Sequence, residues 1–382
     1  MNSVLRLLLP SMILALPLAA SAVERVVLKQ KDDEPRTMTG RLLVTAEDGG
    51  MLLISPDGTL WTAPPEDVIS HEHDDGPMDA LTADEMGRQL LGEMPGGFEI
   101  HTTQHFVICH NTSRAYAQWC GALFERLYKG FDNFWSRRGF DLREPEFPLA
   151  ALVFADQKSY AKYTEREVVG GAGSIIGCYS LRSNRMMMYD LTGMAGLRRP
   201  GDRRNNLAQI EQMLSRPEAE RTVATVVHEA THQIACNRGL HTRYADVPLW
   251  FSEGLAMYFE TPDLNSSKGW RTIGAVNESR LSSFRDYLNR SRPADSLATL
   301  LSSDERCRDP KRRNDAYAEA WALNYFLLRQ RPKQYSAYVK LLSEKQPLMM
   351  DDAAERLREF RQCFGDIGAL DAEFVRQMLK LR

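Results

Sequence analysis

The hydrophobic pattern of this chain changes twice along its length, and this constrains the fold more than any other feature. Residues 24–70 hold short β-prone runs separated by turn sequences. From about Phe98 helical and strand patterns alternate, and after Arg221 the chain reads almost wholly as helix. We therefore predict an α+β fold with a small all-β module at residues 23–75, a linker at residues 76–97 and a larger domain at residues 98–382.

Three β-prone runs define the predicted N-terminal module, at residues 41–45, 51–55 and 59–62. Asp48-Gly49-Gly50 and Pro56-Asp57-Gly58 lie between them and are typical of hairpin turns. With residues 24–29 as a further strand, the module would be a small SH3-like barrel or a meander. The polar residues 71–77 that follow are expected to be a solvated linker, although their His-x-His pair could bind a metal ion weakly.

The larger domain begins with alternating strand and helix patterns. Strands are predicted at residues 98–109, 149–154 and 185–189, and an amphipathic helix at residues 113–138. The Gly-rich residues 170–174 lack the Gly-Lys-Ser/Thr ending of a phosphate-binding loop, so we predict a flexible loop there.

The first 22 residues have the features of a signal peptide. Arg6 is the only charged residue among them, residues 7–20 are apolar, and Ala20-Ser21-Ala22 has the form of a cleavage site. No later stretch approaches the 18 apolar residues of a membrane span, and an uncleaved anchor is the alternative. We expect a secreted or periplasmic protein with no stable membrane insertion after cleavage near Ala22.

Charge and cysteine content narrow the classes of function. The chain has 48 Lys and Arg against 51 Asp and Glu, a net charge of −3, which argues against a nucleic-acid-binding protein. Its six cysteines form no CxxC pair, so a structural zinc knuckle is not indicated. In an exported protein they permit up to three disulfides, and small buried hydrophobic side chains are the alternative.

The strongest functional signal is the HExxH sequence His228-Glu229-Ala230-Thr231-His232. An apolar stripe, a predicted capping box with an early Pro at residues 215–218 and a stop at Gly239 indicate a helix. On a helix, residues four apart share a face, so both imidazoles can reach one Zn²⁺. Glu229 lies to one side of that ion and can accept a proton from water.

A third ligand is expected from a second helix that begins at Pro248 and ends before Pro262. It carries Glu253, and Asp246 and Glu260 are rival ligands. Gly254 is unfavourable inside a helix by about 1 kcal/mol, so we expect it to allow a close approach of this helix to the His228 helix. Position 238 holds Arg where metzincins have their third His, which excludes that class.

His228-Glu-Ala-Thr-His-Gln233, followed by Pro248-Leu-Trp-Phe-Ser-Glu-Gly-Leu-Ala256, resembles the gluzincin zinc metallopeptidases. The nearest resemblance is to exported bacterial proteins that have a peptidase-like domain of unassigned function. It implies a zincin-like fold in which a mixed sheet lies beside two active-site helices, with a helical C-terminal half. It also implies that His228, His232 and Glu253 bind zinc and that Glu229 is the catalytic base.

Residues 316–323 resemble a helix that presents a tyrosine to the reacting carbonyl in the aminopeptidase branch of gluzincins. By this resemblance Tyr317 would stabilise the oxyanion. Tyr317 as a core residue is the alternative. The Gly-x-Met-Glu-Asn sequence with which aminopeptidases hold a free amino terminus is not present, so the resemblance leaves open whether cleavage is terminal or internal.

These observations predict an exported zinc peptidase that acts on peptide or protein substrates, with Glu229 as general base. An extended substrate would pair with residues 185–189 if these form a sheet edge. Two alternatives share the same residues. One is a non-enzymatic binding protein with a structural zinc, and the other is a metal-dependent hydrolase of a non-peptide bond.

Overall fold

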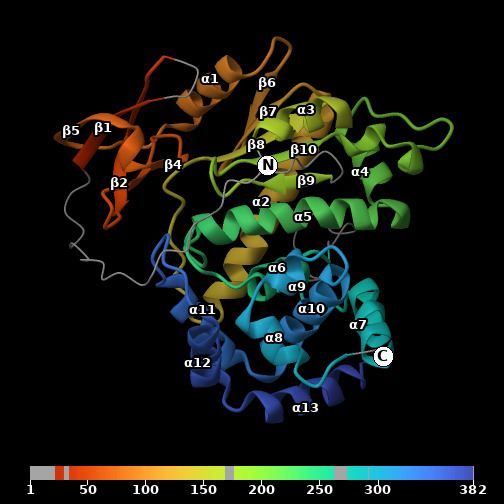
Figure 1. Cartoon of the computed structure of the whole chain (residues 1–382). Helices are drawn as coiled ribbons and strands as arrows, with labels where there is room; N and C mark the ends of the chain where they lie inside the picture. The colour runs from red at the N-terminus through yellow and green to blue at the C-terminus, as the bar shows by residue number, and fades with distance from the viewer. Residues whose placement is uncertain (1–21, 30–33, 168–175, 262–272, 291, 382) are drawn as a thin grey trace. The chain divides into compact units, whose positions relative to one another are not determined.

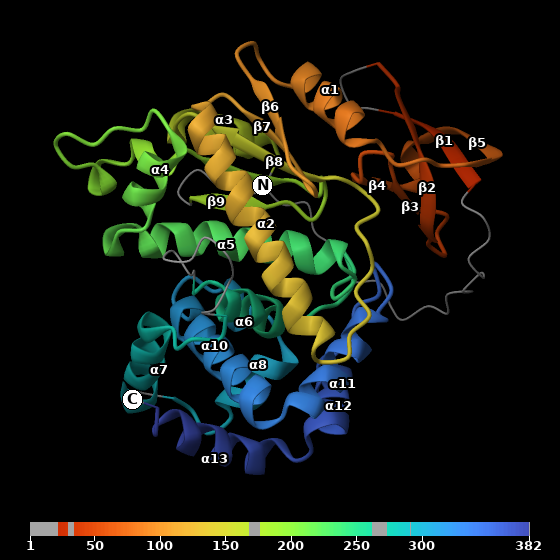
Figure 2. The same ribbon diagram turned by 180° about the vertical axis from the view of Figure 1, so that it is seen from behind.

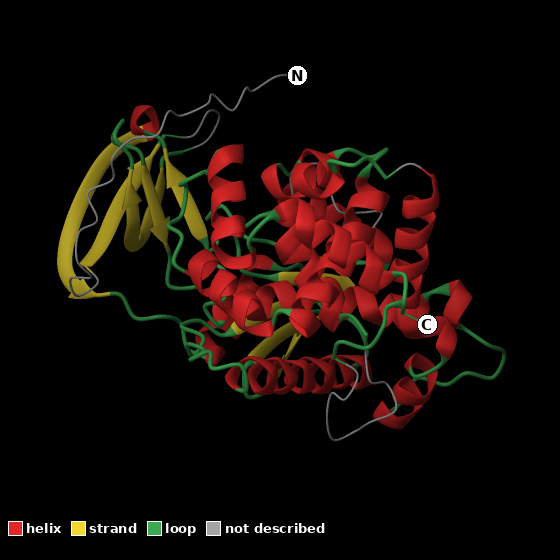
Figure 3. Cartoon of the chain, turned by 90° about the horizontal axis from the view of Figure 1, so that it is seen from below, coloured by secondary structure: helices red, strands yellow, loops and turns green. Residues whose placement is uncertain are grey.

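The computed structural model describes residues 22–29, 34–167, 176–261, 273–290 and 292–381 (Figure 1). Residues 1–21 of the predicted signal peptide and the Gly-rich residues 170–174 lie outside the described residues. The described chain is α+β, as predicted, with two five-stranded sheets and many helices (Figure 3). It divides into two compact units: one runs through Thr82 and includes Arg182–Asn184, and the other comprises Ala83–Leu181 and Arg185 onward.

The first unit is one antiparallel sheet in the order β4-β3-β2-β1-β5. Its strands are β1 (Ala22–Leu28), β2 (Arg36–Thr45), β3 (Met51–Ile54), β4 (Leu60–Ala63) and β5 (Val68–Pro77), with the 3-10 turn η1 (Pro65–Asp67) before β5. A small core of Val26, Met38, Met51, Leu53 and Ala63 stabilises the sheet. The strand predictions in this module are confirmed.

The residues predicted as a linker contain two ordered elements. Residues 68–77 form β5, in which His71 Nε2 and His73 Nδ1 lie 2.7 and 2.9 Å from the carboxylate of Glu24 on β1. The polar run folds as a strand because its partner, which lies far away in the sequence, supplies a buried acid. The second unit then opens with helix α1 (Ala83–Glu93).

The second unit is built on a mixed sheet in the order β6-β7-β8-β10-β9. The strands are β6 (Glu99–Thr102), β7 (Phe106–His110), β8 (Leu149–Phe154), β9 (Gly177–Tyr179) and β10 (Met186–Tyr189). The three central strands are parallel and each edge strand is antiparallel to its neighbour. The predicted strand at 98–109 is therefore a hairpin, because the Glu125 carboxylate accepts hydrogen bonds from the His105 backbone and the Thr103 hydroxyl at the turn.

The predicted sheet edge at residues 185–189 is wrong. Strand β10 is internal, because β9 pairs with it in antiparallel fashion and forms the edge instead. β9 is only three residues long, so its sequence carries little strand pattern.

Helices cover the sheet. The predicted helix at 113–138 is α2 (Arg114–Ser136), whose N-terminus is capped by the Ser113 side chain. Figure 2 shows α2 running across the sheet toward α5 (Pro217–Asn237). The remaining elements between β8 and α5 are α3 (Gln157–Glu167), η2 (Leu191–Gly193), η3 (Ala195–Leu197) and α4 (Leu207–Leu214).

The ends of α5 differ in part from the prediction. Pro217 occupies the first helical position and Gly239, with a φ of +82°, follows the end, as expected. The predicted capping box is wrong because Ser215 is the C-cap of α4, where its hydroxyl donates to the carbonyl of Gln212.

The rest of the second unit is helical, as predicted. It contains α6 (Leu249–Phe259), α7 (Glu278–Arg290), α8 (Ser296–Ser302), α9 (Glu305–Arg308), α10 (Arg313–Gln330), α11 (Pro332–Ser343), α12 (Ala353–Phe364) and α13 (Ile367–Met378). Helix α10 lies at the centre of this half, where it contacts α6, α7, α9, α11 and α13. Its residues are buried on every side from Ala318 to Leu328, so it forms the core around which α6 is placed.

Among the described residues, no helix combines the length and apolar character that a membrane span requires. All six cysteines are free thiols in this structure, and four of them are buried. For these four cysteines the structure therefore has the second alternative, small buried side chains.

Candidate metal centre

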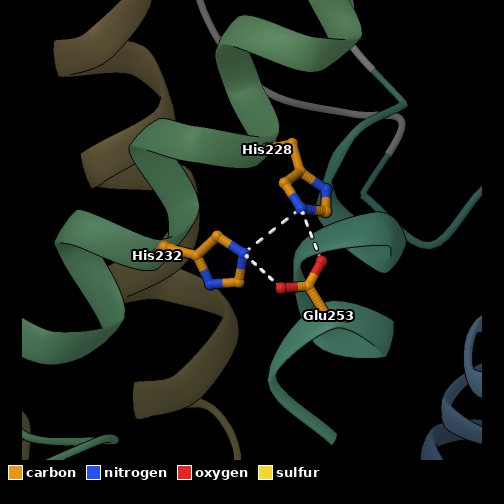
Figure 4. Close-up of side chains that lie close together, drawn as sticks. All are labelled: His228, His232 and Glu253. Carbon is orange, nitrogen blue, oxygen red and sulfur yellow. Dashed lines mark hydrogen bonds and ion pairs between the residues drawn. The ribbon is translucent and has the colours of Figure 1, made fainter. Parts of the chain in front are cut away.

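Two helices of the second unit bring three potential metal ligands together. Helix α5 supplies His228 and His232 from adjacent turns of one face, and α6 supplies Glu253, as Figure 4 shows. The Nε2 atoms of the two histidines lie 3.2 Å apart, and the Glu253 carboxylate oxygens lie 3.2 and 3.5 Å from them. One ligand atom from each residue falls within 4.8 Å of the others.

This donor set fits a metal ion. Two imidazoles and one carboxylate converge on a common point, and no cluster of three such residues is found elsewhere in the described ranges of the chain. The three side chains are between 12% and 16% exposed, so they are accessible from one side. The structure thus supports a site for a metal ion, as predicted from the His-Glu-x-x-His pattern.

Packing against α10 fixes the position of Glu253, which corrects the predicted role of Gly254. A Cβ atom at residue 254 would lie 2.6 Å from the carbonyl oxygen of Ala320 and 2.0 Å from Nδ2 of Asn324, both on α10. The close approach therefore joins α6 to α10 and not to the His228 helix. The glycine is required because no side chain fits between the two backbones.

Glu260, the first rival ligand from the sequence, contacts His228 on the side of its ring that faces away from Glu253. Its Oε2 lies 3.0 Å from Nδ1 of His228, while Nε2 of the same ring faces Glu253. The second oxygen of Glu260 accepts a hydrogen bond from Asn277 at 2.7 Å. A carboxylate in this position orients the imidazole and fixes its tautomer, so Glu260 positions a potential ligand.

Asp246, the other rival ligand, lies in a different cluster. Its carboxylate accepts a hydrogen bond from Nε of Arg356 at 2.9 Å, and both side chains are buried. Because a buried carboxylate paired with a guanidinium is already neutralised, Asp246 stabilises the contact between α12 and the loop before α6.

Glu229 lies in the same cavity but outside the ligand group. Its Oε2 accepts a hydrogen bond from the backbone N–H of Tyr179, on the edge strand β9, at 2.9 Å. Burial, with a smaller contribution from Glu253, raises the pKa of Glu229 to about 7. A carboxyl group with such a pKa can both accept and return a proton near neutral pH.

The three ligand groups affect each other's protonation. Burial alone would raise the pKa of Glu253, but His232 and His228 hold it at about 2. Burial lowers the pKa of His232 to about 4. For His228 burial is opposed by the bonds to Glu253 and Glu260, which raise its pKa well above the usual value. An anionic Glu253 beside neutral His232 is the state that a cation needs.

Tyr317 on α10 lines the same cavity, where its side chain is close enough to help lower the pKa of Glu253. Burial, followed by the charge of Glu253, raises the pKa of the Tyr317 hydroxyl above its usual range. The tyrosine is therefore a neutral donor beside the ligand cluster. The tyrosine lines the cavity and also packs against the apolar core.

The cavity has a volume of about 530 Å³. Its charged residues lie near the ligand group, and an uncharged wall is formed by the segment between α5 and α6. This wall includes Tyr244, Ala245 and Val247. His241 is also in the wall, and no hydrogen-bond partner of its buried Nε2 is found among the described residues. Burial lowers the pKa of His241 to about 3, so the wall is uncharged at neutral pH.

A family described as a protein of unknown function (DUF1570) matches residues 222–349. The matched segment contains the three potential ligands, Glu229 and Tyr317, and covers less than half of the chain. No curated protein matches the chain.

Sequence reasoning missed two contacts of this site. The bond from Tyr179 to Glu229 is made by a backbone N–H, which leaves no signature in the sequence. The role of Glu260 depends on which nitrogen of His228 it faces, and only the structure gives this. The signal that was available was the placement of both Glu253 and Glu260 on the second helix.

Proposed function

We propose that this chain is an exported zinc-dependent peptidase of the gluzincin type. The observation that carries the proposal is the placement of Glu229, which faces the same cavity as the ligand cluster without belonging to it. A purely structural metal site has no use for an adjacent base. A His, His, Glu donor set with access from one side is the arrangement of catalytic zinc.

The roles of the protein groups follow from their positions. Zinc, when bound, would polarise the scissile carbonyl and make water more acidic. Glu229 would accept the proton of the attacking water and then pass it to the leaving amine. Tyr317 would donate a hydrogen bond to the developing oxyanion. Glu260 would hold His228 in the orientation that the ion requires.

Strand β9 offers a place for the substrate backbone. It forms the edge of the sheet and carries both Tyr179, which holds Glu229, and Gly177, which also lines the cavity. An extended peptide that adds to this edge by main-chain hydrogen bonds would pass in front of the ligand cluster. Such pairing would not depend on particular side chains.

The experiment is the Glu229→Gln change, with Glu220→Gln as matched control. Glu220 is an exposed residue in the first turn of the same helix. The Glu229 variant should keep zinc, measured by metal analysis, because all three ligands remain. Its cleavage of a diverse peptide library should fall by about a hundred- to ten-thousand-fold, since general-base catalysis is lost. The control should cleave like the wild type.

Three results would contradict the proposal. If the zinc-loaded Glu229 variant cleaves at the wild-type rate, Glu229 is not the base. If the wild type binds zinc and cleaves no peptide, the chain is a binding protein or acts on another bond. If a chelator removes the metal without affecting cleavage, the metal is not catalytic.

A further inference from the structure

A positively charged side chain enters the cavity from the first turn of α7. Arg280 lines the cavity together with Glu260 and Tyr317. Its side chain is 27% exposed, so it is partly covered by protein and still open to the cavity. The mechanism outlined above does not use this residue.

The guanidinium of Arg280 is poorly paired. Its nearest acid is Glu260, where Nε lies 3.9 Å from Oε1, beyond hydrogen-bond distance. Both Glu260 oxygens already have partners in His228 and Asn277. Among the described residues, the two terminal nitrogens of Arg280 have no hydrogen-bond partner. The guanidinium carbon lies 5.9 Å from the ring centre of Tyr317, so the ring lies beside the charge and does not take up its N–H groups in hydrogen bonds.

A weakly paired guanidinium of this kind is suited to one kind of ligand. Its terminal N–H groups match the two oxygens of a carboxylate and bind them in bidentate fashion. The acids that line the cavity, Glu229, Glu253 and Glu260, would repel such a group when ionised. Arg280 is therefore the place in this cavity where a substrate carboxylate would be stabilised.

The distance from Arg280 to the ligand cluster sets where that carboxylate lies in the substrate. A single side chain, Glu260, spans the gap between Arg280 and His228. Its Oε1 lies 3.9 Å from Nε of Arg280, and its Oε2 lies 3.0 Å from Nδ1 of His228. Consecutive Cα atoms of a peptide are about 3.8 Å apart, so a gap of this size corresponds to one or two residues.

We propose that Arg280 binds a carboxylate of the substrate, located one or two residues from the bond that is cleaved. This inference rests on the proposed peptidase function for the meaning of the bond. The carboxylate comes from the C-terminus of the peptide or from an Asp or Glu side chain. In the first case the protein removes short C-terminal fragments, and in the second it cleaves beside acidic residues.

The test separates binding from cleavage. Short N-acetylated peptides of alanine and leucine are made in three forms: with a free C-terminal carboxylate, with a C-terminal amide, and as an amide with glutamate as the last residue. Their dissociation constants are measured by calorimetry on zinc-loaded Glu229→Gln protein, which retains the cavity. Cleavage of the same peptides is measured on the wild type. Both series are repeated with Arg280→Gln, Arg280→Lys and, as control, Arg290→Gln.

Arg290 is a suitable control because it ends the same helix and pairs with Asp315 at the surface. We expect the free-acid peptide to bind at least about tenfold more tightly than the amide, as for a bidentate charged pair. Arg280→Gln should abolish this ratio, Arg280→Lys should retain part of it, and Arg290→Gln should leave it unchanged. If the glutamate peptide binds as tightly as the free acid, Arg280 binds the carboxylate of a glutamate side chain as well as that of the C-terminus.

Equal binding of the acid and amide forms would overturn the inference. So would an Arg280→Gln change that weakens both forms equally or lowers the zinc content, because Arg280 would then only hold Glu260. If the wild type cleaves none of the peptides while Arg280-dependent binding of the acid persists, the peptidase function is wrong and the carboxylate site stands.

Discussion

The contact between α6 and α10 allows a sharp test of how the proposed ligand Glu253 is placed. In Gly254→Ala a methyl group would lie 2.6 Å from the carbonyl oxygen of Ala320 and 2.0 Å from Nδ2 of Asn324. The carbonyl belongs to a helix backbone and cannot rotate away. The Asn324 side chain is also fixed, because it donates to the carbonyls of Trp250 and Ala320 and accepts from the Tyr335 hydroxyl.

Three terms decide the size of the effect. Overpacking of a core contact costs about 1–3 kcal/mol. Displacing Asn324 leaves buried polar groups without partners, which costs about 1–3 kcal/mol more. The better helix propensity of alanine offsets about 1 kcal/mol of this loss in the free energy of unfolding. The free energy of unfolding should therefore fall by roughly 3 kcal/mol, the middle of this range.

Urea unfolding followed by tryptophan fluorescence measures this change, and metal analysis of the same sample reports on the site. Zinc content should fall as well, since Glu253 precedes the substituted residue. Gly92→Ala in α1 is the matched control, because nothing lies within 4 Å of a Cβ atom there. That change should stabilise the protein by up to about 1 kcal/mol. A Gly254 variant as stable as the control, with its zinc intact, would refute the tight contact.

Three other changes test further contacts of the site. Glu260→Gln removes the charge that orients His228, so zinc affinity should fall about 10- to 100-fold in competition with a chelator. Complete loss of zinc at saturating metal would instead make Glu260 a ligand. Tyr317→Phe should lower turnover by about a hundred- to a thousand-fold if the hydroxyl stabilises the oxyanion. A loss of about 1 kcal/mol in stability with unchanged rates would instead mark it as a structural hydrogen bond. Burial, with His232 nearby, lowers the pKa of His241 to about 3, whereas the unfolded residue takes up a proton near pH 6.5. Below pH 6.5 the unfolded state therefore binds more protons than the folded state. The free energy of unfolding should decrease as the pH is lowered, and this residue alone should account for a loss of about 2 kcal/mol at pH 5. His241→Leu should lose this dependence in urea unfolding measured from pH 8 to pH 5, and equal slopes in both proteins would contradict it.

The sequence predicted those parts of the fold that depend on local signals. Helix α5 was found because Pro217 and Gly239 mark its ends and an apolar stripe runs between them. Strand β5 was taken for a linker because its polar residues acquire a reason to be ordered only opposite Glu24. Strand β9 was missed because three residues are too few to show alternation.

In the candidate site too, features set by local sequence could be predicted and features set by contacts between distant residues could not. His228 and His232 could be predicted because residues four apart on a helix share a face. Glu253 could be proposed from the second helix, but choosing between it and Glu260 required the side-chain geometry. The two acids contact opposite nitrogens of one imidazole, at 3.2 and 3.0 Å. Composition and spacing do not encode that difference.

The contact made by Gly254 shows why the neighbourhood of a ligand was harder to predict than the ligand itself. A glycine inside a helix indicates that another backbone is close, but it does not say which one. The nearest candidate in sequence was α5, whereas the neighbour is α10, which also carries Tyr317. One close helix contact therefore places Glu253 and Tyr317 together. A change at this contact should alter metal binding and turnover together, whereas a change at Glu229 should alter turnover alone.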